Sequence, residues 1–180
     1  MRSQRFSTLS VLLVTLLVAL LAVTPALAER EDDTNRKSKN GLTEGTIGGV
    51  EVQIEYGRPK VKERAIWGGL VPWGQVWRTG ADEATKVTFS GDVTIEGQAL
   101  AAGSYSLFTI PGQSEWTVIF NTVADQWGAY EYAEGKDALR VKVASTAHEH
   151  TEEMAFVIDG DNLVLRWERL ALPIAVAAGN

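Results

Sequence analysis

Apolar and polar residues alternate along most of the chain after residue 46, which is the period of a β-strand with one buried face. In the segment GGVEVQIEY (48–56), every second residue from the first valine is apolar, and glutamate or glutamine stands between them. The same alternation recurs in LRVKV (139–143). No stretch shows the period of an amphipathic helix, and residues 122–136 have room for one helical turn at most. The pattern therefore predicts an all-β protein.

Turn residues between the apolar runs predict how the strands connect. KVTFS (86–90) and DVTIEG (92–97) are joined by a Ser-Gly-Asp turn, which favours a hairpin. EMAFVID (153–159) and NLVLRWERL (162–170) are joined at a Gly-Asp pair, which favours a second one. Both connections are short enough for antiparallel neighbours.

Two further runs are apolar on both faces, so we expect them to be central strands. They are SYSLFTI (104–110) and WTVIFN (116–121), and a Pro-Gly turn lies between them. Residues 172–176 add a last short strand. The sequence therefore predicts a single-domain antiparallel β-sandwich of the jelly-roll kind with eight or nine short strands. A closed barrel is the alternative, because periodicity does not distinguish the two.

Residues 57–83 interrupt the alternation and form one long connection. They contain five glycines, two prolines and three tryptophans. A connection of this length inside a compact domain is usually functional or disordered. Disorder would leave the tryptophans in water, so we expect an ordered loop that is packed by its own aromatic residues.

The N-terminal 28 residues have the layout of a cleaved secretory signal peptide: two arginines, a fifteen-residue apolar core and an Ala-Leu-Ala cleavage site. An uncleaved anchor is the alternative. We expect export to the periplasm or the medium, with no stable membrane insertion after cleavage. Residues 29–46 are polar and predict a flexible linker. This leaves 47–176 as the all-β domain and 177–180 as a tail.

Charge and cysteine content exclude several classes of function. The formal charge is −6, and removal of the two leader arginines makes it −8, which argues against nucleic acid or anionic membranes as partners. The absence of cysteine excludes disulfides, thiolate metal sites and a cysteine nucleophile. Loop 57–83 differs from the rest of the chain, because its basic residues outnumber its acidic ones by two.

The charged and aromatic side chains of this loop are the candidate ligand-binding residues. Tryptophan offers a flat apolar face, arginine a fork for anionic groups, and carboxylates accept hydroxyl protons, a set that suits a small polar ligand such as a carbohydrate. The candidates are Arg58, Trp73, Trp77, Arg78, Asp82 and Glu83. In the structural alternative, Arg78 pairs with Glu83 or Asp82, and the tryptophans close one end of the sandwich.

Two other groups of residues offer binding chemistry outside the loop. Trp127 and Tyr130 form a further aromatic platform near such a site, or else belong to the core. His148-Glu149-His150 lacks the spacing of a zinc protease motif and falls in a polar segment, so we expect a solvated connection between strands and no metal site. We expect no cofactor.

Catalytic chemistry has few candidates in this chain. The two histidines both fall in that polar segment, and no G-x-S-x-G motif is present. Pairing of Asp82 or Glu83 with a second carboxylate would allow hydrolysis in the glycosidase manner. The second carboxylates considered are Glu115, Glu131 and Glu134.

Three segments resemble a bacterial family catalogued as domain of unknown function 2911. They are EYGRPKVKERAIWGGLVPWGQVWRTGADEAT, LAAGSYSLFTIPGQSEWTVIFN and QWGAYEY, within a resemblance that runs from about residue 49 to residue 167. The resemblance implies an exported all-β domain and brings no established activity. Compared with the family pattern, Asp82 replaces a usual asparagine, Trp73 a common tyrosine and Gln75 a common lysine. Should Gln75 and Asp82 line a site, these replacements imply a less anionic ligand.

The sequence predicts an exported, non-catalytic domain that binds a small polar ligand through loop 57–83. Two alternatives remain: a carboxylate-based hydrolase that uses the same loop, and a protein–protein interaction module anchored by tryptophan and arginine.

Overall fold

The computed structural model describes residue 30 and residues 32–179, so the predicted signal peptide lies outside the described residues. One 3₁₀ turn, η1 (Glu134–Lys136), lies within 122–136, where one helical turn at most was expected. Ten strands are formed: β1 (Lys39–Ile47), β2 (Val50–Arg58), β3 (Thr85–Phe89), β4 (Val93–Ile95), β5 (Gln98–Leu100), β6 (Gly103–Ile110), β7 (Glu115–Asn121), β8 (Asp137–Ala144), β9 (Thr146–Asp159) and β10 (Asn162–Ala178).

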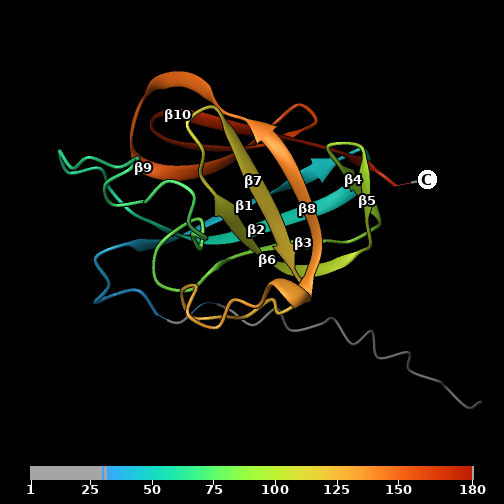
Figure 1. The fold of residues 1–180 in the computed structure, drawn as a ribbon. Coiled ribbons are helices and arrows are strands. Elements are labelled where there is room, and N and C mark those ends of the chain that lie inside the picture. Colours follow the sequence, from blue (N-terminus) through green and yellow to red (C-terminus); the bar gives the residue numbers. More distant parts are fainter. Residues whose placement is uncertain (1–29, 31, 180) are drawn as a thin grey trace, which may run out of the picture.

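The strands form two antiparallel sheets that pack face to face (Figure 1). One sheet has the order β1-β2-β3-β6-β7-β8, and the other has the order β5-β4-β10-β9. One continuous core of buried apolar side chains fills the space between them. The predicted all-β sandwich is confirmed, with one strand more than the upper expected number.

Of the two predicted hairpins, one is present and one is wrong. β9 pairs with β10, as the turn residues predicted, and the two expected central strands β6 and β7 also pair with each other. The run at 86–90 does not pair with the run at 92–97, because β3 lies between β2 and β6, whereas β4 lies between β5 and β10 in the other sheet. Phe89 and Val93 are each only 1 % exposed. The Ser-Gly-Asp turn is therefore a corner between sheets, which local turn chemistry does not distinguish from a hairpin.

The prediction of a flexible linker over 29–46 is wrong for its second half. β1 begins at Lys39 and pairs with β2 over its whole length, from Lys39 opposite Arg58 to Ile47 opposite Val50. Of its nine residues only Ile47 is buried, because an edge strand is held by backbone hydrogen bonds and needs few apolar side chains. At the other end, β10 continues to Ala178, so the predicted tail begins inside a strand.

The segment with both histidines is also part of a strand rather than a connection. β9 runs from Thr146 to Asp159, and His148, Glu149 and His150 lie in its first half. Most of the residues in this half are exposed, and for that reason it carries a polar sequence. Polarity here indicates exposure to solvent and not an irregular backbone.

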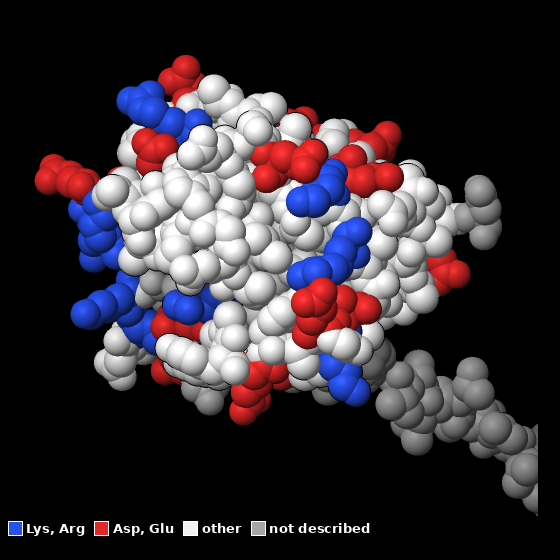
Figure 2. Space-filling view, in the orientation of Figure 1, with Lys and Arg blue, Asp and Glu red and all other residues white. Residues whose placement is uncertain are grey.

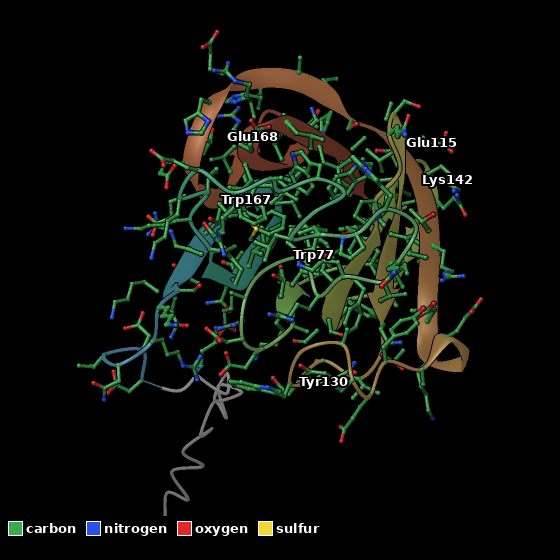
Figure 3. The ribbon with its side chains drawn as sticks, turned by 60° about the vertical axis from the view of Figure 1, so that its left-hand side comes forward. Trp77, Glu115, Tyr130, Lys142, Trp167 and Glu168 are labelled. Atoms are coloured by element: carbon green, nitrogen blue, oxygen red, sulfur yellow. The ribbon has the colours of Figure 1, made fainter. Side chains whose placement is uncertain are left out.

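A cluster of tryptophans anchors the long loop to the core. Trp116 on β7 and Trp167 on β10 are 0 % and 1 % exposed, and Trp67 and Trp77 from the loop pack against both of them. Ring centroids of Trp77 and Trp167 are 5.9 Å apart in a stacked arrangement, and both residues are labelled in Figure 3. The expectation of an ordered loop packed by its own aromatic residues is confirmed.

Candidate functional site

The loop between β2 and β3 and the segment before β1 line a cavity of about 330 Å³ against Trp167 of β10. We call this cavity the cationic basin. Its lining residues are Lys37, Ser38, Pro59, Lys60, Lys62, Arg64, Leu70, Trp77, Arg78, Gly80, Ala81, Asp82 and Trp167. Lys and Arg side chains gather at the left of Figure 2, on the side where the segment before β1 and the long loop lie in Figure 1.

Positive charge dominates the lining of the basin. It contains five lysines and arginines and a single carboxylate, that of Asp82. The Arg64 guanidinium donates to the carbonyls of Val61 and Lys60, and Lys60 Nζ lies 4.0 Å from a Glu153 oxygen. Like Arg64, the remaining three cations, at Lys37, Lys62 and Arg78, have no acidic partner among the described residues. An excess of unpaired positive charge in a concave site attracts anions.

Arg78 is the best positioned of these cations. It is half-buried, and its Nε atom is enclosed without a hydrogen-bond partner among the described residues. The preceding residue, Trp77, exchanges both backbone hydrogen bonds with Thr109 on β6, at 2.7 and 2.9 Å. The Arg78 carbonyl accepts a hydrogen bond from the Thr85 amide at the start of β3. The backbone of Arg78 is thus fixed to β6 through Trp77 and to β3 through its own carbonyl.

The backbone next to Arg78 is strained. Thr79 is fully buried with φ of 53°, and Asp82 has φ of 62°, both in the left-handed region that β-branched residues in particular avoid. Such a conformation costs about 1–3 kcal/mol and persists only where the surroundings impose it. Here the hydroxyl of Thr85 donates to the Thr79 carbonyl at 2.7 Å, and the Thr79 hydroxyl donates to that of Thr109 at 3.1 Å.

Glu83 lies outside the basin and is held by two arginines from the segment before β1. Arg36 donates to both of its carboxylate oxygens, at 2.5 and 2.7 Å, and Arg30 donates to one of them at 2.8 Å. Arg30 also donates to the carbonyls of Glu55, Ala81, Glu83 and Ala84. Glu83 therefore docks the N-terminal segment. The structural alternative expected an ion pair between Arg78 and Glu83, and this pair does not form.

This ion-pair cluster makes stability depend on pH. Burial raises the pKa of Glu83, but the Arg36 hydrogen bond and the charges of Arg30 and Arg36 outweigh it, so that the pKa is lowered overall. A lowered folded-state pKa stabilises the fold above the unfolded value of about 4.3, and this stability is lost as the pH falls through the folded value. Urea unfolding should therefore show Glu83→Gln to be less stable than wild type at pH 7, with the gap narrowing below about pH 4.3. A gap that is independent of pH would contradict this role.

Of the six candidates from the sequence, the structure brings three together. Trp77, Arg78 and Asp82 line the basin. Arg58 instead pairs with Glu153 at 2.7 Å. Trp73 is 37 % exposed and packs beside Trp67, and Glu83 is held as described above.

Sequence reasoning did not single out several lining residues. Three of them, Lys60, Lys62 and Arg64, were used only in the net charge of the loop. That excess of positive charge is the sequence feature that indicates the basin. Lys37 was assigned to the linker, and Trp167 lies ninety residues after Trp77, so only the folded chain brings it to the site.

The geometry gives less support to a carboxylate pair or a metal site than to the basin. None of Glu115, Glu131 and Glu134 lines the basin beside Asp82. The Glu134 carboxylate accepts a hydrogen bond from Arg140 at 2.7 Å. Within the described part of the chain, no group of three or more His, Asp or Glu side chains is placed to hold a metal ion.

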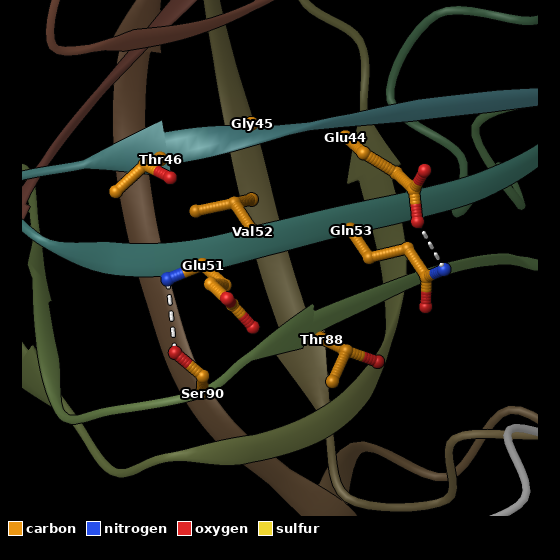
Figure 4. A pocket seen from close by; sticks show the side chains of 8 residues that line it. All are labelled: Glu44, Gly45, Thr46, Glu51, Val52, Gln53, Thr88 and Ser90. Atoms are coloured by element: carbon orange, nitrogen blue, oxygen red, sulfur yellow. Dashed lines mark hydrogen bonds between the residues drawn. The ribbon is translucent and has the colours of Figure 1, made fainter.

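A second hollow, of about 400 Å³, lies on the outer face of β1, β2 and β3 (Figure 4). Its lining residues are Glu44, Gly45, Thr46, Glu51, Val52, Gln53, Thr88 and Ser90. The Gln53 side chain donates to Glu44 at 2.8 Å, and the Glu51 amide donates to the Ser90 hydroxyl at 2.9 Å. Its polar groups thus partly satisfy one another, and it has no cation, so the basin is the stronger candidate.

Comparisons with known proteins give a family and no function. Across residues 30 and 32–179, no helix has the length and apolar character needed to cross a membrane. Neither a curated protein nor a solved structure matches the chain. Residues 38–176, most of the chain, match the family described as "Protein of unknown function (DUF2911)". The resemblance seen in the sequence is confirmed, and the chain belongs to this family.

Proposed function

We propose that the protein is a binding module that holds a small anionic ligand in the cationic basin. The observation that carries this proposal is Arg78, a half-buried guanidinium that lines the cavity without an acidic partner among the described residues. A buried or half-buried charge is normally paired, because removal from water is costly. A bound anion would supply the missing partner.

The lining also defines the chemistry of the ligand. The planar fork of Arg78 suits a carboxylate, a sulfate or a phosphate, and the exposed Lys37 and Lys62 extend the positive field to the mouth. Trp77 and Trp167 supply an apolar wall. Asp82 has no side-chain hydrogen bond within the described residues, and its carboxylate can only accept hydrogen bonds. A ligand with both an anionic group and hydroxyl groups satisfies this set, and an acidic sugar has both.

The composition of the lining supports binding rather than hydrolysis. Hydrolysis by paired carboxylates needs two of them within roughly 5–10 Å across the scissile bond. Asp82 is the single carboxylate of the basin. We place the ligand outside the cytoplasm, on the basis of the predicted signal peptide.

Tryptophan fluorescence of residues 29–180 tests the proposal, because Trp77 and Trp167 line the basin. The probes are galacturonate, inorganic phosphate, sulfate and, as the neutral control, galactose. We expect galacturonate to change the emission saturably, with an affinity that falls as salt rises, and galactose to leave it unchanged. Equal responses to galacturonate and galactose, or no response to any anion, would refute the proposal.

A further inference from the structure

Two exposed aromatic side chains stand beside the basin on a different loop. Trp127 and Tyr130 lie in the connection between β7 and η1 and are 54 % and 85 % exposed. Tyr130 lies at the periphery of the molecule in Figure 3. We call this pair the aromatic ledge. Side chains of this size are normally buried, so an exposed pair indicates a contact surface.

Backbone pairing fixes the ledge to the wall of the basin. Trp127 forms a β-bridge with Glu83, and the Gly128 amide donates to the Asp82 carbonyl at 3.1 Å. A Cβ atom on Gly128 would lie 3.0 Å from the Tyr130 ring and 4.0 Å from Arg78 Nη1. The tyrosine ring and the guanidinium that carries the proposed function therefore flank the same glycine.

The other end of the ledge is tied to the segment before β1. The Arg36 guanidinium lies over the Trp127 ring, 5.7 Å from its centroid, while its nitrogens bind Glu83. The next residue, Lys37, lines the basin. Trp127 is thus held next to Arg36, while the Tyr130 ring and the Arg78 guanidinium both lie close to Gly128.

We propose that the ledge is a second subsite and that the ligand is an acidic oligosaccharide, such as an oligomer of a uronic acid. This inference rests on the function proposed above. One sugar places its carboxylate at Arg78, and the next stacks one face on Tyr130 or Trp127. An acidic oligosaccharide accounts for both the basin and the ledge. An inorganic anion would use the basin alone, and a neutral glycan would use the ledge alone.

Charge complementarity favours this occupant over single-stranded nucleic acid, which also combines stacking with cations. A phosphodiester backbone requires a cationic track over several nucleotides, whereas the arginines next to the ledge and on β2, namely Arg36 and Arg58, are paired with glutamates, and the formal charge of the chain is −6. The Asp82 carboxylate in the lining can accept hydrogen bonds from the hydroxyl groups of a sugar, whereas a phosphodiester group has no hydrogen-bond donor.

The test compares galacturonate with tetragalacturonate by calorimetric titration of residues 29–180. We expect the tetramer to bind about tenfold more tightly than the monomer, since a second sugar would bury an apolar face against an aromatic ring. At least one of the variants Tyr130→Leu and Trp127→Leu should reduce the advantage of the tetramer and leave the affinity for the monomer unchanged. Tyr130→Phe, which keeps the ring, should retain the advantage. Leu42→Ala, at a 56 % exposed apolar residue on β1, is the control and should change neither affinity.

The outcomes separate the two proposals. Binding of the monomer with no gain for the tetramer, or a gain that survives both leucine variants, overturns the ledge and leaves the basin standing. Absence of binding by either galacturonate probe overturns both. Tighter binding of oligothymidylate than of tetragalacturonate would assign the two-part site to nucleic acid and overturn the glycan.

Discussion

Trp116→Ala is expected to lower the free energy of unfolding by about 3–5 kcal/mol, the usual cost of truncating a fully buried aromatic side chain. Trp116 is 0 % exposed and lies 5.0 Å from Trp67 and 6.4 Å from Trp77, centroid to centroid. Its removal opens a cavity beneath the long loop and withdraws one of the surfaces on which the loop packs. The melting temperature should fall by roughly 10 °C for a domain of this size.

Thermal and urea unfolding of Trp116→Ala and Tyr130→Ala check this expectation. Tyr130 is 85 % exposed, so its truncation should change stability by less than about 0.5 kcal/mol. Similar losses in the two variants, or a stable Trp116→Ala protein, would mean that the tryptophan cluster does not anchor the loop.

Arg78→Ala is expected to weaken the binding of galacturonate by about 10- to 100-fold, as loss of a charge-assisted hydrogen-bond pair does. The fold should survive with a change in stability below about 1 kcal/mol, because no buried acid among the described residues depends on Arg78. Arg78→Lys keeps the charge and loses the planar fork, so its affinity should fall between those of wild type and Arg78→Ala. Fluorescence titration gives the affinities, and urea unfolding gives the stabilities.

Arg166→Ala is the matched control for Arg78→Ala. Arg166 is an arginine on β10 that pairs with Asp159 at 2.9 Å and does not line the basin. Its removal changes the net charge by the same amount and should leave the affinity for galacturonate within about twofold. Equal effects of the two substitutions would show that net charge, and not the basin, governs binding.

The all-β class and the ordered loop could be predicted from the sequence because both depend on local patterns. Alternation identifies a strand whenever one of its faces is buried, as in β2. Three tryptophans among glycines indicate an ordered loop, since they would otherwise be left in water. The edge strand β1 escaped prediction because its stability comes from backbone pairing with β2, which leaves almost no trace in side-chain polarity.

The candidate site was predicted only in part, for a related reason. Trp77, Arg78 and Asp82 stand in the conspicuous loop, and they line the basin. Lys37 and Trp167 come from segments before and long after that loop, and only the sandwich topology brings them to it. The apparent linker also carries Arg30 and Arg36, whose ion pairs with Glu83 determine how the segment docks. Long-range pairing of charges has no periodic signal in a single sequence.

The most direct test of an anion-binding basin is a ¹H–¹⁵N NMR titration of residues 29–180 with galacturonate. The basin predicts that the amide shifts concentrate at residues 60–64 and 78–82, which contribute most of the lining. Shifts that concentrate instead at the polar hollow on β1 to β3, or no shifts at millimolar galacturonate, would contradict the account.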